Sequence, residues 1–175
     1  EGESAYIKWF KNNALHFENK LPIVTGKDID EEAAYHSDIY GKGAFFMHTL
    51  RYVLGDSIFF PTLKQLATAE KYNYDNLVNT DDIEQLFSKN AGIDLTPLFD
   101  LYLRTTNKLE IAVKRTGIAQ YNIRLINIDM QLPLDIITNN GIKRILANKT
   151  DITVNSTTLP VLDPDMFYLT KITIE

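Results

Sequence analysis

Up to about residue 105, hydrophobic side chains recur at spacings of three and four, which is the period of amphipathic helices. In the first such segment, residues 3–19, one face carries Tyr6, Trp9, Phe10, Asn13, Ala14 and Phe17 and is therefore mostly apolar. Further segments predict helices over 44–54 and 58–71, a fourth from Thr80 to Gly92, and a fifth over 94–104.

Glycine, proline and threonine indicate where these helices begin and end. Gly55 follows the helix 44–54 at the position where a left-handed residue is favoured. Pro61 lies near the expected start of the third helix, where a missing N–H is tolerated. Thr80 is the expected cap of the fourth helix, and Thr96 that of the fifth, with Pro97 as its first residue.

After Arg104 the pattern changes to short, partly alternating segments rich in Ile, Val, Thr and Tyr. They are residues 109–117, 121–130, 131–141, 142–148, 151–157 and 167–175. Strands of this length and number favour a small antiparallel β-sandwich of the immunoglobulin-like type. We therefore expect an α+β chain, all-α over 1–106 and β over 107–175.

Composition narrows the class of partners. The net charge of -5 and the pI of about 5.2 argue against a nucleic-acid partner. No run approaches the roughly 18 apolar residues of a membrane span. The chain has no cysteine, which excludes disulfides, thiolate catalysis and cysteine-ligated zinc within it.

The histidines do not form a recognisable metal site. His16, His36 and His48 lie more than four residues apart, and no H-E-x-x-H sequence places two imidazoles on one helical face. His16 and His48 fit better as helix residues than as ligands. We expect no metal to be held by this chain alone.

Other catalytic motifs are equally lacking. The Gly41–Gly43 segment reads Gly-Lys-Gly, which does not match a phosphate-binding P-loop, and no G-x-S-x-G sequence is present. The adjacent carboxylates of Glu31 and Glu32 belong to an acidic run and are interpreted as a solvated loop.

Tyr40 is the residue for which two interpretations stand side by side. It precedes Gly41, Lys42 and Gly43 and the helix predicted from Ala44. One interpretation is a core tyrosine beside glycines that the packing requires. The other is a phenol that donates a hydrogen bond to an oxyanion, with glycines that allow the backbone to approach a substrate.

Residues 39–104 carry a series of motifs in a fixed order. There are five motifs, in this chain order: Tyr40, Lys42, Gly43 and Ala44; Leu50, Arg51 and Gly55; Phe59, Phe60 and Leu63; Thr80, Asp82 and Ile83; and Gly92, Asp94, Leu95, Phe99, Tyr102 and Leu103. This series resembles the aminopeptidase N and leukotriene-A hydrolase family of zinc metallopeptidases, the gluzincin type. Tyr102 stands where that family has Trp or Tyr.

The resemblance implies a fold and a set of roles. Residues 1–106 would be the helical C-terminal part of a thermolysin-like catalytic domain, and the β domain would follow it. Tyr40 would stabilise the tetrahedral intermediate of peptide hydrolysis, with Tyr35 as an active-site neighbour. Zinc, its H-E-x-x-H ligands and a later glutamate ligand would belong to a part of the catalytic domain upstream of this chain.

These implications lead to two hypotheses of function. In the first, the chain is the C-terminal portion of an aminopeptidase that removes N-terminal residues from peptides, and is inactive by itself. In the second, it is a binding or scaffolding module of a peptidase-like protein that has lost its zinc site. Bacterial relatives of this type are often exported, so a periplasmic or cell-surface location is an expectation from the resemblance.

Overall fold

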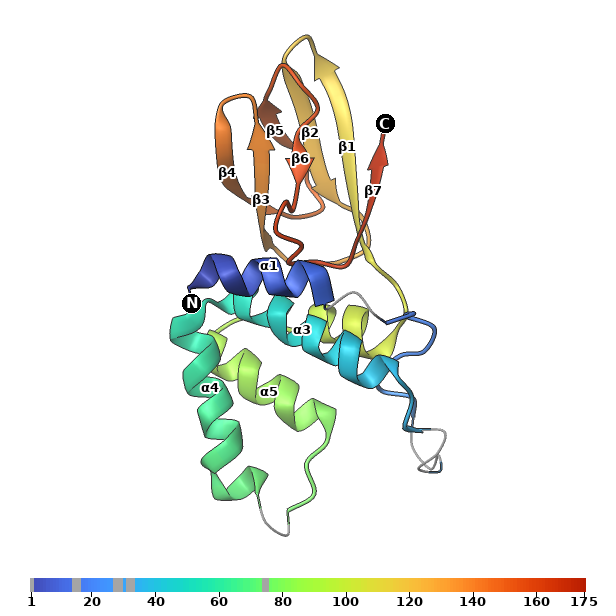
Figure 1. The fold of residues 1–175 in the computed structure, drawn as a ribbon, viewed down its shortest axis with the longest axis vertical. Helices are drawn as coiled ribbons and strands as arrows, with labels where there is room; N and C mark the ends of the chain where they lie inside the picture. The colour runs from blue at the N-terminus through green and yellow to red at the C-terminus, as the bar shows by residue number, and fades with distance from the viewer. Residues whose placement is uncertain (1, 14–16, 27–29, 31–33, 74–75) are drawn as a thin grey trace.

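The computed structural model describes residues 2–13, 17–26, 30, 34–73 and 76–175. The helices gather at one end of the molecule and two β-sheets face each other at the other end (Figure 1). Helix α1 (Glu3–Asn13) lies between the sheets and helix α3 (Asp38–Leu54), so the first helix of the chain contributes to the junction of the two halves (Figure 1). The architecture is therefore mixed α and β, as the change of sequence pattern predicts.

The helical half contains five α-helices in the described part of the chain, together with two short helical turns of other types. The α-helices are α1 (Glu3–Asn13), α3 (Asp38–Leu54), α4 (Asp56–Thr68), α5 (Thr80–Ala91) and α6 (Thr96–Phe99). A 3₁₀ turn, η1 (Glu70–Tyr72), follows α4, and a π-helical turn, η2 (Asp100–Arg104), continues α6. None of these described helices is long and apolar enough to cross a membrane.

The strands form a sandwich of two sheets. They are β1 (Leu109–Gly117), β2 (Gln120–Leu125), β3 (Leu132–Thr138), β4 (Gly141–Ala147), β5 (Ile152–Asn155), β6 (Val161–Leu162) and β7 (Thr170–Ile174). One sheet has the order β5-β2-β1-β7 and the other β4-β3-β6. The prediction for 109–117 is confirmed over its whole length, whereas β6 is too short to show a period in the sequence.

The prediction of an entirely antiparallel sandwich is wrong at one edge. Strand β7 pairs with β1 in parallel, with Leu109 opposite Thr170 and Val113 opposite Ile174. The reason lies in the preceding segment, residues 163–169, which returns the chain to the helices before β7 begins. Strands β1 and β7 therefore leave the junction from the same end and run in the same direction (Figure 1).

Helix α3 begins earlier than the sequence predicts. The expected start was Ala44, but the helix begins at Asp38, so Tyr40, Gly41 and Gly43 lie in its first two turns. A Cβ on Gly41 would lie 2.9 Å from the Cβ of Phe17. Tertiary packing therefore explains Gly41 inside a helix, where glycine is intrinsically unfavourable.

Two other predicted helix ends differ from the structure. The helix predicted over 3–19 ends at Asn13; Ala14 and His16 lie outside the described residues, and residues 17–20 are not helical. Pro61 is inside α4, because that helix begins at Asp56. The remaining predicted ends are those of α5 and α6.

Helix α5 is capped one residue before the expected position. Asn79 accepts a hydrogen bond from the Asp82 N–H, and the Asp82 side chain accepts one from the Asn79 N–H, which is a capping box. Thr80, the expected cap, is the first helical residue. Gly92 ends the helix in the left-handed conformation, as predicted, with φ of 68°. Thr96, expected as the cap of the next helix, is likewise helical.

The helices and the sandwich share one continuous hydrophobic core. At their junction the buried Tyr102 hydroxyl accepts a hydrogen bond from the Leu169 N–H at 3.0 Å. The Thr49 hydroxyl donates to the Phe167 carbonyl at 2.6 Å, and the Phe167 ring stacks on Tyr52 at 3.8 Å. The segment 163–169 thus holds the sandwich against α3 and η2. The helical elements end with η2 at Arg104, and the strands begin with β1 at Leu109.

Candidate functional site

Tyr40 is a surface residue, not a core residue. It lies in the first turn of α3 with 60% of its side chain exposed, and Tyr35 beside it is 64% exposed. The two hydroxyls hydrogen-bond to each other, and the rings meet edge to face with centroids 5.8 Å apart. The hydrogen bond between the two hydroxyls raises the pKa of Tyr40 above its ordinary value, so its phenol is protonated at neutral pH.

Lys42, two residues further on, has the opposite environment. Its side chain is fully buried, and its ammonium group donates to the Thr105 carbonyl at 2.7 Å. Because the lysine of the Gly-Lys-Gly segment points into the protein, it is not available to a phosphate group. Sequence reasoning placed Lys42 in the family motif but assigned it no role.

The histidines of the described segments act as structural residues. Nδ1 of His48 lies 2.8 Å from the Tyr6 hydroxyl, and its ring stacks on Phe10 at 3.8 Å. His36 contacts the Pro22 carbonyl through Nε2 at 3.2 Å, whereas His16 lies outside the described residues. Within the described residues, no group of three His, Asp or Glu side chains could hold a metal ion. These residues alone do not fit a zinc site.

His48 gives the folding stability a pH dependence. Burial, helped by the nearby positive charge of Arg51, lowers the pKa of His48 from 6.5 to about 4, while Asp165 acts in the opposite direction. Between pH 6.5 and 4, His48 is therefore protonated in the unfolded chain but neutral in the folded chain. The contribution of neutral His48 to the unfolding free energy is fully present above pH 6.5 and is lost as the pH falls toward 4. It amounts to about 3 kcal/mol, at about 1.36 kcal/mol per pKa unit.

Denaturant unfolding of the wild type and of His48→Phe at several pH values measures this contribution. We expect the unfolding free energy of the wild type, relative to that of His48→Phe, to fall by about 3 kcal/mol from pH 7 to pH 4, because Phe does not titrate. Burial raises the pKa of Asp163 to about 6, which acts in the opposite direction over the same range. Since Asp163 is present in both proteins, the difference isolates His48; a difference independent of pH would contradict the assignment.

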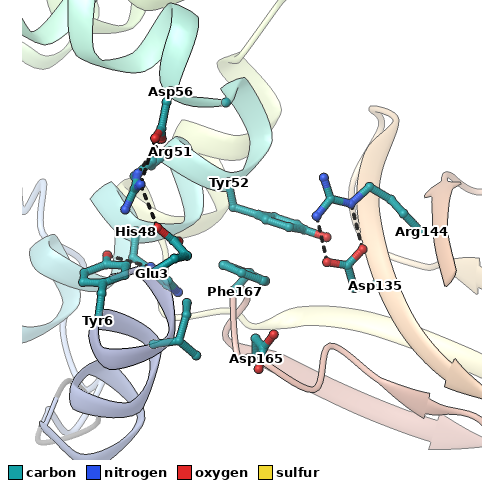
Figure 2. A pocket seen from close by; sticks show the side chains of 12 residues that line it. Glu3, Tyr6, His48, Arg51, Tyr52, Asp56, Asp135, Arg144, Asp165 and Phe167 are labelled. Carbon is teal, nitrogen blue, oxygen red and sulfur yellow. Dashed lines mark hydrogen bonds and ion pairs between the residues drawn. The ribbon is translucent and has the colours of Figure 1, made fainter. Parts of the chain in front are cut away.

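A cavity of about 350 Å³ lies at the junction of α1, α3 and the sandwich (Figure 2). Arg51 on its wall bonds Asp56 at 2.6 Å and Glu3 at 3.1 Å. Arg144 makes two hydrogen bonds to Asp135, at 2.7 and 2.8 Å. Figure 2 shows these two groups of charged side chains on either side of the Tyr52 ring. The first set of ion pairs lies among α1, α3 and α4 and the second between β3 and β4, and neither Tyr35 nor Tyr40 is among the residues that line the cavity.

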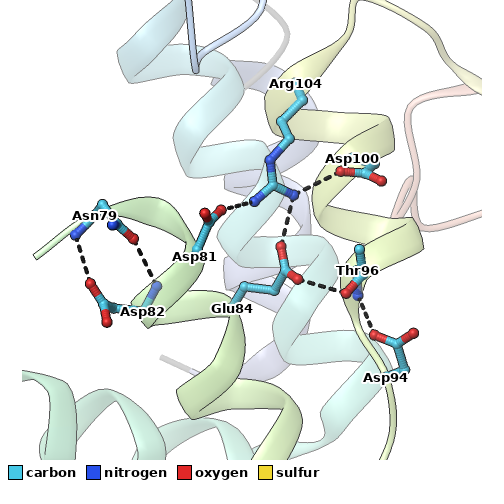
Figure 3. Close-up of polar contacts among 8 residues, drawn as sticks. All are labelled: Asn79, Asp81, Asp82, Glu84, Asp94, Thr96, Asp100 and Arg104. Carbon is cyan, nitrogen blue, oxygen red and sulfur yellow. Dashed lines mark hydrogen bonds and ion pairs between the residues drawn. The ribbon is translucent and has the colours of Figure 1, made fainter. Parts of the chain in front are cut away.

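A second polar cluster fastens α5 to η2 (Figure 3). The Arg104 guanidinium contacts Glu84 at 2.7 Å, Asp100 at 2.8 Å and Asp81 at 2.6 Å. The nearly buried Glu84 also accepts a hydrogen bond from the Thr96 hydroxyl at 2.6 Å. With every member paired inside the cluster, its geometry indicates a structural role.

The chain matches no known family model and no curated protein sequence. Its fold is similar to the crystal structure of Legionella pneumophila aminopeptidase A in complex with aspartic acid, with a TM-score of 0.60 and 17% sequence identity. The match covers 82% of this chain and 18% of that chain, so this chain corresponds to less than a fifth of the aminopeptidase. At this identity the likeness shows a shared fold.

Proposed function

We propose that this chain is the C-terminal portion of a zinc-dependent aminopeptidase and that Tyr40 stabilises the tetrahedral intermediate of peptide hydrolysis. The observation that carries the proposal is the exposed Tyr40 in the first turn of α3, in a fold shared with an aminopeptidase. The substrate class is peptides with a free N-terminus. The fold likeness and the ordered motifs of residues 39–104 support this class together.

The described residues contain no metal site, so the zinc ligands and the general base would come from residues outside this chain. Zinc bound at such a site would supply Lewis-acid activation of a water molecule. The contribution of this chain is the phenol of Tyr40, which donates a hydrogen bond to the oxygen that becomes negatively charged. Tyr35 orients that phenol through the contact between their hydroxyls.

Hydrolysis of aminoacyl arylamides tests the proposal. We expect the full-length parent protein, purified with one zinc ion per molecule, to release the arylamine, because it contains both the metal site and Tyr40. We expect the 175-residue chain to show no zinc-dependent release, since its described residues offer no metal site. Zinc-dependent activity in the 175-residue chain would contradict the division of the site between the two parts. A full-length protein that neither binds zinc nor hydrolyses arylamides would instead favour the scaffolding module.

A further inference from the structure

We infer that Asp38 and Lys42 are positioning residues that hold the Tyr40 phenol in its direction toward the substrate. The inference rests on the proposed function of Tyr40 and assigns a role to two buried charges that flank it in α3. Both residues lie two positions from Tyr40, one on each side. Both are almost fully buried, at 3% and 0% exposure, while Tyr40 is 60% exposed.

The Asp38 carboxylate organises the segment that precedes α3. It accepts hydrogen bonds from the backbone N–H groups of Glu18 at 2.9 Å, Lys20 at 2.8 Å and Leu21 at 3.5 Å. Burial acts to raise the pKa of Asp38, but these N–H donors hold it below its ordinary value. The carboxylate is therefore charged at neutral pH and ties the first residue of α3 to residues 18–21.

The Lys42 ammonium ties the next turn of the same helix to the link between helices and sandwich. It donates to the Thr105 carbonyl at 2.7 Å. The Asn19 side-chain amide donates to the Thr106 carbonyl at 2.7 Å, so the two segments held by Asp38 and Lys42 also contact each other. Burial lowers the pKa of Lys42, and the charge of Asp38 partly offsets this effect.

Helix geometry converts these two contacts into a constraint on Tyr40. Residues four positions apart lie on one face of a helix, whereas a residue two positions away points to the opposite face. Fixing Asp38 and Lys42 therefore fixes the rotation of the first turns about the helix axis. Phe17 packs closely against Gly41 between them and limits sliding of the same turns. These contacts together fix the direction of the Cα–Cβ bond of Tyr40 relative to the rest of the protein.

Stability alone does not account for a buried lysine at this place. Desolvating a charged group is unfavourable, and buried charges replaced by apolar groups of similar volume often leave a protein equally stable. A requirement for orientation does account for it, because a displacement of about 1 Å can lower a catalytic rate by about 10²-fold. A positioning role therefore predicts an effect on the catalytic rate, whereas a purely structural role predicts an effect on stability alone.

A double-mutant cycle in the full-length, zinc-loaded protein tests the inference. We expect Lys42→Met to lower kcat for aminoacyl arylamides by about 10-fold to 100-fold with little change in KM. In the Tyr40→Phe background, the same substitution should change kcat by less than about 2-fold, since the group that it positions is gone. Asp38→Asn is the second variant and should show the same coupling if Lys42→Met does not fold.

Thr49→Val is the matched control. Thr49 is also a fully buried polar residue of α3, but its hydroxyl contacts Phe167 at the sandwich and not the first turn. Its effect on kcat should be the same in the wild-type protein and in the Tyr40→Phe background. Equal effects of Lys42→Met in both backgrounds, or no effect on kcat, would overturn the positioning role alone. If Tyr40→Phe by itself leaves kcat unchanged, this result would contradict the proposed function of Tyr40 itself, and with it the positioning role.

Discussion

Tyr40→Phe in the full-length protein is expected to lower kcat for aminoacyl arylamides by about 10²–10³, the effect of removing one oxyanion donor. The substitution removes only a hydroxyl from a side chain that is 60% exposed, so folding and zinc content should not change. The hydroxyl acts on charge that develops in the transition state, and the loss should therefore appear in kcat and equally in kcat/KM. Steady-state kinetics at matched zinc occupancy measures both.

Two further tyrosines serve as controls for this result. Tyr35→Phe keeps the Tyr40 hydroxyl and removes only its neighbour, so it should have a smaller effect. Tyr72→Phe changes a half-buried tyrosine in η1, after α4, and should leave the kinetics as they are. A Tyr40→Phe effect confined to KM, or a full kcat with zinc bound, would return Tyr40 to a purely structural role.

Arg104→Met is expected to lower the unfolding free energy by about 2–4 kcal/mol, because it removes the cation that compensates a nearly buried carboxylate. The Glu84 side chain is 12% exposed and would keep only its hydrogen bond from Thr96. Asp81 and Asp100 are mostly exposed and would regain water (Figure 3). Denaturant unfolding of the 175-residue chain measures the change.

A surface arginine provides the comparison for Arg104. Arg124 also pairs with two carboxylates, those of Asp151 and Glu175, but both pairs lie at the surface of the sandwich. Arg124→Met should therefore change the unfolding free energy by about 0–1 kcal/mol. Adding Glu84→Leu to Arg104→Met should restore part of the lost stability, since it removes the uncompensated charge. Similar losses of unfolding free energy for the two arginine variants would show that the Glu84–Arg104 pair stabilises the fold no more than a surface ion pair.

The order of motifs over residues 39–104 leads to one candidate residue, Tyr40. Its residue type and its place before Gly-Lys-Gly were visible in the sequence. Its exposure was not, because the glycines around it fitted a core tyrosine equally well. The buried environment of Asp38 and Lys42 was also invisible, since charged residues near a helix start are ordinarily solvated.

The sequence by itself determined the kinds of element and their order. Spacings of three and four indicated the helices, and alternation rich in Ile and Val indicated the strands from Leu109 onward, because side-chain period depends on local backbone geometry. Gly92 could be assigned to a helix end for the same local reason.

Only the tertiary structure decided the rest. Helix α3 begins at Asp38, where the hydrogen bonds that Asp38 accepts and the contact of Phe17 with Gly41 outweigh the low helix propensity of glycine. Strand β7 is parallel to β1 because residues 163–169 return the chain to the helices through Phe167 and Leu169. These contacts join residues up to 118 positions apart, so no local pattern in the sequence reports them.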